Sequence, residues 1–94
     1  MRQYELMCIL NPDLEESRID TLITRLQEVV TSAGGELQEV DKWGKRHLSY
    51  PIKKFYDGYY LVVNFKGDNS MLRELDRILK VAEENIRHMI IRRD

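Results

Sequence analysis

The side chains that most often perform chemistry in proteins are few in this sequence, and they lie far apart. Cys8, the single cysteine, sits in the apolar run YELMCIL with no histidine nearby, which favours a buried, inert thiol over a nucleophile. His47 and His88 have no Asp, Glu or Cys at metal-ligand spacing, and His88 is expected to pack on a strand face. Neither a glycine-rich phosphate loop nor an H-E-x-x-H zinc motif occurs. The sequence therefore predicts no enzyme and no metal or cofactor site.

Residues 41–54, DKWGKRHLSYPIKK, indicate a different chemistry. Five lysine and arginine side chains oppose Asp41 and give this segment a net charge of +4, although the whole chain has a net charge of −1. Cations neutralise phosphates, and an aromatic ring or a planar guanidinium stacks on an exposed base, so this mixture suits RNA. Pro51 favours an extended conformation at Tyr50. The alternative is a solvated loop in which Trp43 covers the core, and composition leaves both interpretations open.

Charge is distributed unevenly along the chain. Residues 13–28 and 68–84 have net charges of −3 and −2, whereas residues 41–54 and 85–94 have net charges of +4 and +2. The two acidic segments are also the two with helical apolar spacing. A basic surface beside acidic ones would hold an anionic partner in a fixed orientation.

Length and composition restrict the class of protein. The 94 residues, 43% of them apolar, are enough for one modest core, so we expect a single domain over residues 1–94. No apolar run approaches the length of a membrane span, and the opening MRQYEL lacks the apolar stretch of a signal peptide. One cysteine permits no internal disulfide. These features predict a cytoplasmic protein that is stabilised by packing.

The first half of the chain predicts a strand, a helix and a long extended segment. Residues 4–10 form a short apolar run that fits a strand buried on both faces. After Pro12, with acidic residues at the start of the helix, apolar residues recur at helical spacing until Gly34-Gly35. Residues 36–50 then predict an extended segment, which Gly44 is expected to kink or bulge.

The second half repeats this pattern. Residues 58–66 are nearly all aromatic or β-branched and predict a central strand. Residues 68–84 predict a helix capped by Asn69 or Ser70, with an apolar stripe, and residues 86–91 predict a last strand. The stripe comprises Leu72, Leu75, Leu79 and Ala82.

The resulting order, βαββαβ, predicts an α+β fold of the ferredoxin-like split sandwich type. Two βαβ units with right-handed crossovers place both helices on one face of a four-stranded antiparallel sheet. The other face of the sheet is then open. Many unrelated functions share this topology, so function must be sought in particular residues.

One RNA-binding fold with this topology, the RNA-recognition motif, has stacking aromatics on its third strand. The stretch DGYYLVVNF matches that motif at Gly58, Tyr59 and Val62. It lacks the small residue and the later aromatic residue that complete the stacking platform. Tyr59 and Tyr60 are therefore expected to pack in the fold or to contact a partner.

The basic segment WGKRHLSYPIKK closely resembles the motif of the bacterial small-subunit ribosomal protein six family. The similarity extends to MRQYEL at the start, LNPDL before the first helix and GYYLVVNF after the motif, and so covers the whole chain. This resemblance implies a ferredoxin-like, RNA-binding constituent of the small ribosomal subunit. Members of the family join the central domain of small-subunit ribosomal RNA together with ribosomal protein eighteen, and the same RNA and protein partners are implied here.

The resemblance also implies which side chains meet RNA. Leu48, Tyr50 and Ile52 are expected to fix the strand that presents the donors. Some family members continue into an acidic C-terminal tail, whereas this sequence ends at Asp94, so any tail contact is absent or lies beyond it. The expected RNA-binding residues are Arg2, Lys42, Trp43, Lys45, Arg46, His47, Lys53, Lys54, Arg87, Arg92 and Arg93.

An alternative is a small ferredoxin-like regulatory module that pairs its sheet edges with a second protein and binds no RNA. Phosphate contacts make affinity fall steeply with ionic strength, whereas a mainly apolar protein interface does not. Salt dependence therefore separates the two hypotheses. Because the net charge is only −1, we also expect weak binding to RNA alone and clear binding once the second protein is added.

Overall fold

The computed structural model describes residues 1–93 and contains six regular elements; Asp94, the last residue of the basic C-terminal segment, lies outside the described residues. The βαββαβ order predicted from the apolar pattern is confirmed. The elements are β1 (Arg2–Leu10), α1 (Glu16–Ser32), β2 (Glu36–Ile52), β3 (Phe55–Gly67), α2 (Asn69–Val81) and β4 (Asn85–Arg92). No helix in the described part of the chain is long and apolar enough to cross a membrane.

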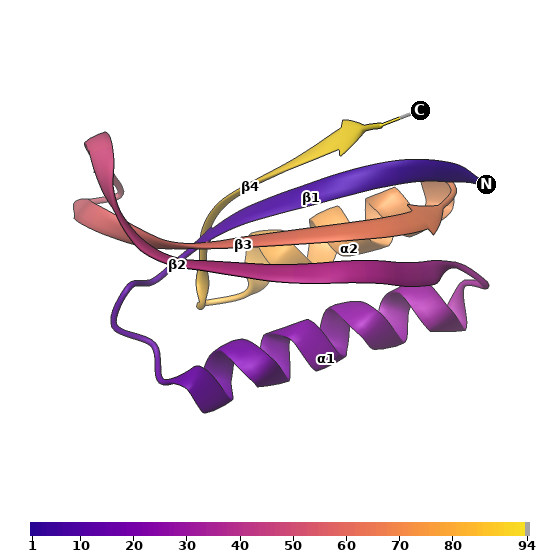
Figure 1. Cartoon of the computed structure of the whole chain (residues 1–94), viewed down its shortest axis with the longest axis horizontal. Helices are drawn as coiled ribbons and strands as arrows, with labels where there is room; N and C mark the ends of the chain where they lie inside the picture. Colours follow the sequence, from indigo (N-terminus) through magenta and orange to yellow (C-terminus); the bar gives the residue numbers. More distant parts are fainter. Residues whose placement is uncertain (94) are drawn as a thin grey trace.

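The strands form one sheet in the order β2-β3-β1-β4, and every neighbouring pair is antiparallel. Both helices lie on the same face of this sheet (Figure 1). We call this the helix-covered face and the opposite one the open face. The predicted ferredoxin-like split sandwich is thus confirmed.

The core lies between the sheet and the helices. Along β1, Tyr4, Leu6, Cys8 and Leu10 are buried, and the residues between them are half-buried. The prediction that residues 4–10 are buried on both faces is therefore wrong, because both helices lie on the helix-covered face and the β1 side chains on the open face stay partly exposed. On β3, by contrast, Leu61, Val62 and Val63 are all buried.

The helices follow their apolar stripes, with corrections at their ends. α2 ends at Val81, so Ala82 follows it. Met71 is buried, whereas the predicted stripe residue Leu72 is half-buried. α1 begins at Glu16, so the earlier acidic residues precede it; the Asn11 side chain instead accepts a hydrogen bond from the Asp13 amide and forms a turn. α2 is capped by Asp68, whose carboxylate accepts from the Met71 amide at 3.0 Å, and not by Asn69 or Ser70. The buried residues of the two helices are Ile19, Leu22, Leu26, Val30, Met71, Leu75 and Leu79.

β2 and β3 continue beyond the rest of the sheet as a two-stranded hairpin. Leu10, the last residue of β1, pairs with Tyr59, which also pairs with Lys45, so the residues from Arg46 to Gly58 extend past the end of β1. We call residues 45–58 the hairpin arm. The predicted irregularity at Gly44 is confirmed, because the register shifts between Lys42 and Gly44 and Gly44 has a φ of 86°.

Candidate nucleic-acid interface

The hairpin arm is bent because its two strands differ in length. His47 pairs with Asp57 and Ile52 pairs with Phe55, so residues 48–51 lie opposite Tyr56 alone. Pro51, which has no N–H, cannot donate to the ladder within this bulge. Extra residues on one strand bend the pair, and the arm curls away from the helices at the end of the molecule opposite both termini (Figure 1).

The arm packs on the open face through apolar side chains. Leu48 is 6% exposed, and together with Ile52 it lines a cavity of about 300 Å³ over Ile9 of β1 and Met89 of β4. A Cβ atom at Gly58 would collide with Ile9, so glycine allows the arm to approach β1 closely. The expectation that Leu48 and Ile52 fix the strand thus agrees with their positions.

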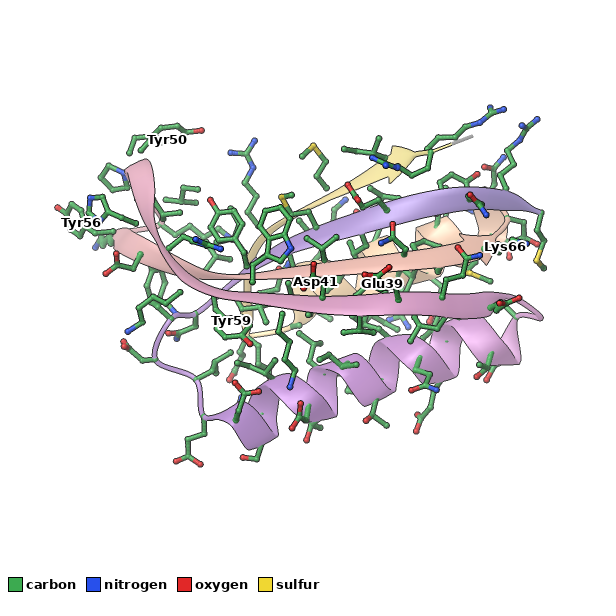
Figure 2. All side chains as sticks on the ribbon, in the orientation of Figure 1. Glu39, Asp41, Tyr50, Tyr56, Tyr59 and Lys66 are labelled. Atoms are coloured by element: carbon green, nitrogen blue, oxygen red, sulfur yellow. The ribbon has the colours of Figure 1, made fainter. Side chains whose placement is uncertain are left out.

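Tyr50, the third expected anchor, occupies a different position. Its side chain is 60% exposed. It lies near the end of the arm (Figure 2). Its hydroxyl accepts a hydrogen bond from Nη1 of Arg87 on β4, at 3.3 Å. Tyr50 therefore links the arm to the opposite edge strand by a polar contact in addition to lining the cavity.

The basic side chains of the arm are exposed and uncompensated. Lys45, Arg46, Lys53 and Lys54 form no ion pair with any residue among 1–93. Lys45 and Arg46 are consecutive strand residues and therefore point to opposite faces. His47 differs, since its Nδ1 lies 3.1 Å from Oδ1 of Asp57 on the facing strand. The arm thus presents free cationic donors on both of its faces.

Lys42 lies in another environment, although it is close in sequence. Its Nζ lies 2.8 Å from Glu16 Oε2 and 2.6 Å from Asp20 Oδ1, both on α1. Hydrogen bonds to Asp20 and then to Glu16 raise the pKa of Lys42 above its usual value. The register opposite Leu61 places Lys42 on the helix-covered face. The structure therefore separates Lys42 from the arm, and its predicted RNA contact stays a prediction that this position does not favour.

Trp43 lies on the open face, so it does not cover the main core. Its ring stacks on Tyr60 with 6.3 Å between centroids and 9° between planes, and its Nε1 donates to Asp41 Oδ2 at 2.9 Å. The side chain is still 44% exposed. Asp41 and Glu39 lie along the straight part of β2, whereas Tyr59 points toward α1 (Figure 2).

The remaining predicted cations lie at two ends of the molecule. Arg87 lies near the start of β4, next to the arm. Arg2, Arg92 and Arg93 lie near the two termini, at the far end of the longest dimension, which measures 36 Å (Figure 1). Arg93 also approaches Glu5, with 3.9 Å between Nη1 and Oε2. The residues predicted to bind RNA therefore do not form one patch.

Lys80 is a cation near the arm that sequence reasoning did not select. It lies in the last turn of α2, where a basic residue complements the helix dipole, so the sequence alone offers an ordinary explanation for it. In the folded chain it lines a notch that Lys53 and Arg87 also line. No local sequence signal could have brought these three residues together.

Cys8 and His88, the side chains considered for chemistry, lie in surroundings that suit a structural role. Burial raises the pKa of the Cys8 thiol to about 12, which disfavours the reactive thiolate. His88 lies between strand and helix, with its Nε2 2.7 Å from Asp76 Oδ1 on α2 and its Nδ1 3.0 Å from Asn85 Nδ2. Residues 1–93 contain no group of three or more His, Cys, Asp or Glu side chains that could hold a metal ion.

Comparison with known proteins places this fold and surface in one family. The model of the family described as Ribosomal protein S6 matches residues 3–92. Small ribosomal subunit protein bS6 of Carboxydothermus hydrogenoformans is 43% identical over 100% of this chain and 98% of that protein. The same protein of Dictyoglomus turgidum is 48% identical over 96% of this chain and 93% of that protein.

A solved structure agrees with these sequence relatives. The crystal structure of 30S ribosomal protein S6 from Thermotoga maritima superposes with a TM-score of 0.89 at 34% identity, covering 98% of this chain and 87% of that one. Proteins of this kind are cytoplasmic components of the ribosome. The chain therefore belongs to the ribosomal protein S6 family and is a protein of the small ribosomal subunit.

Proposed function

We propose that the chain binds the central domain of small-subunit ribosomal RNA through its hairpin arm, in cooperation with ribosomal protein eighteen. One observation carries the proposal: the cations of the arm have no carboxylate partners among residues 1–93, whereas Lys42 on the helix-covered face is paired with two. Unpaired lysine and arginine side chains can neutralise phosphates without first breaking an internal ion pair. The role is that of a binding component and not of a catalyst.

The shape of the arm supports contact with a nucleic-acid backbone. Residues 46–58 project past β1, so phosphates can approach the arm without meeting the acidic helices. Consecutive cations at Lys45 and Arg46 reach opposite sides of one strand. Such contacts would position the protein on the RNA and would not by themselves read its sequence.

The open face beside the arm supports a protein partner. Trp43, Met89 and Ile91 are exposed there at 44%, 50% and 39%, and the cavity under Leu48 is lined mainly by apolar side chains. Glu39 and Asp41 lie on the same face, opposite Asn64 and Val62, and would oppose phosphates. Apolar and acidic groups together suit a basic protein, and ribosomal protein eighteen is the partner that we propose for this face.

Cooperation follows from the small number of free cations. With a net charge of −1, this chain alone offers little electrostatic attraction for RNA. A basic protein docked on the open face would extend the positive surface of the arm, so that each protein orders part of the binding site of the other. RNA must then tighten the protein pair by the same factor by which the second protein tightens RNA binding.

The test is a titration of the two proteins with and without a central-domain RNA fragment near physiological salt. We expect weak or undetectable RNA binding by this chain alone, clear binding after ribosomal protein eighteen is added, and a tighter protein pair when RNA is present. Equal affinity of the protein pair in both conditions would exclude cooperation. Protein pairing that is insensitive to salt, with no RNA binding under any condition, would instead favour the regulatory-module alternative.

A further inference from the structure

The turn at the end of the hairpin arm has an unusual composition for its shape. Lys53 and Lys54 connect the paired residues Ile52 and Phe55, and their φ values are 48° and 72°. A two-residue hairpin turn with positive φ at both central positions is of type I′, which strongly prefers Asn-Gly. Side chains with a Cβ disfavour this left-handed region. Two lysines therefore occupy positions where other residues would stabilise the arm better.

The same turn lies beside a cationic notch at the start of β4. The notch has a volume of about 230 Å³, and its lining includes Lys53 from the turn, Lys80 from the last turn of α2 and Arg87 from β4. Three segments distant in sequence thus bring basic residues to one small space. Tyr50 links the arm to β4 beside this notch, since its hydroxyl accepts a hydrogen bond from Arg87 Nη1 at 3.3 Å.

The charges around the notch are mostly uncompensated. Lys53 and Arg87 form no ion pair within the described chain, residues 1–93. Lys80 forms an ion pair with Asp76, with 3.0 Å between Nζ and Oδ2. The Asp76 carboxylate also accepts a hydrogen bond from His88, so it is shared between the two. The balance is positive, and Arg87 retains donors that Tyr50 does not use. A singly charged backbone phosphate matches this arrangement.

We propose that the notch between Lys53, Arg87 and Lys80 binds one backbone phosphate of the RNA, and that the strained lysine turn is retained because it places Lys53 there. This inference rests on the proposed RNA-binding function. It adds a specific phosphate-binding site and the residue Lys80 to it. A strained turn at a binding surface is the expected compromise, since it lowers stability but places a residue that binds.

The first test uses Lys53→Asn combined with Lys54→Gly, which relieves the turn and removes both charges. We expect the melting temperature to rise by about 4 °C or more, because a type I′ turn favours Asn-Gly. With ribosomal protein eighteen present, the slope of log affinity for central-domain RNA against log salt should decrease by about 0.7 to 1.8, for one or two lost contacts. Stability and binding should thus change in opposite directions.

The matched control is Arg25→Gln combined with Arg73→Gln, which removes two exposed charges on the helices. We expect this control to leave the salt slope unchanged. An equal decrease of the salt slope in the control would mean that only overall charge matters. That result would contradict a specific phosphate site at the notch. An unchanged slope in the turn variant, while the unaltered protein binds RNA normally, would also overturn it. If the unaltered protein pair fails to bind RNA at all, the proposed function itself fails, which is a separate result.

The second test asks whether Lys53 and Arg87 share one phosphate. We expect Lys53→Asn together with Arg87→Gln to decrease the salt slope by only about 0.7 to 0.9, the value for a single phosphate. Independent contacts would give about twice that decrease and would contradict a shared site. A titration with inorganic phosphate at constant ionic strength, monitored by amide NMR shifts, tests whether the notch binds free phosphate instead of an RNA phosphate. If inorganic phosphate binds tightly at the turn while the turn variant binds RNA as well as the unaltered protein does, the notch is a site for free phosphate. That result would overturn the assignment to RNA.

Discussion

The helix-covered face and the hairpin arm use charged side chains in opposite ways. On the helix-covered side, Lys42 binds Glu16 and Asp20, and Arg18 binds Glu84 with 2.8 Å between Nη2 and Oε2. In the arm, Lys45 and Arg46 have no such partner within residues 1–93. Lys42, beside α1, is therefore already held by carboxylates, whereas Lys45 and Arg46 in the arm are free to bind an anion.

This difference shows that charge in a sequence segment is a poor guide to available charge. Residues 41–54 form one basic stretch in the sequence, yet the bulge at Gly44 divides it. Lys42, before the bulge, turns toward the acidic helix α1, and the residues after it leave the sheet. Stability therefore resides in the helix-covered core, and binding is assigned to the arm.

The largest contrast should appear in stability. Phe65 on β3 is fully buried against the helices and stacks on Tyr4 with 5.6 Å between ring centroids. Phe65→Ala should lower the free energy of unfolding by roughly 3 to 5 kcal/mol. Asn64→Ala, on the neighbouring open-face residue, should change it by less than about 0.5 kcal/mol. Urea denaturation measures both, and similar losses would mean that the two faces are not energetically distinct.

The anchor of the arm should give an intermediate effect. Leu48 is buried but borders a cavity, so removal of its side chain deletes contacts on only part of its surface. We expect Leu48→Ala to lower the unfolding free energy by about 2 kcal/mol, near the lower limit for buried leucine. Chemical denaturation provides the measurement. A loss well below 1 kcal/mol would show that the arm does not pack on the open face in solution.

The smallest effect concerns an ion pair on the helix-covered side. The His88 hydrogen bond, followed by that of Lys80, lowers the pKa of Asp76 below its ordinary 3.8. A lowered folded-state pKa stabilises the protein above the unfolded-state value, and this stabilisation is lost as the pH falls through the folded-state value. Because the Asp76 side chain is 43% exposed, Asp76→Asn should cost less than about 1 kcal/mol at pH 7.

The pH dependence provides the check on that prediction. Unfolding curves of the unaltered protein and Asp76→Asn should differ at pH 7 and converge well below pH 3.8, where the native carboxylate is protonated as well. Asn keeps an oxygen that can accept from His88, so the variant removes the charge and preserves the shape. A difference that does not depend on pH would show that the carboxylate charge contributes nothing.

The apolar pattern predicted the fold well because core periodicity is a local signal. Ile19, Leu22 and Leu26 recur at helical spacing, and the order of strands and helices leaves few possible topologies. The predicted cap of α2, Asn69 or Ser70, lies one or two residues from the observed cap, since Asp, Asn and Ser cap helices about equally well and Asp68, Asn69 and Ser70 are adjacent.

The candidate site was less predictable because it depends on tertiary contacts. The sequence identified Lys45 and Arg46 as basic residues of an extended segment. Nothing in the sequence shows that Lys42 contacts α1 or that Lys53 lies near Lys80. Arg2 and Arg93 resemble the arm cations in type, yet they lie at the other end of the molecule. Sequence patterns identify candidate donors, and only the fold determines which donors share a surface.

The most direct test of the account compares Lys45→Ala combined with Arg46→Ala against Lys42→Ala, in RNA binding with ribosomal protein eighteen present. The arm variant should weaken binding and decrease the salt slope by about 0.7 to 0.9 for each lost phosphate contact, with little change in folding. Lys42→Ala should leave the slope unchanged, because its charge is held by Glu16 and Asp20. An unchanged slope in the arm variant, or an equal decrease in both, would contradict the assignment of RNA binding to the arm.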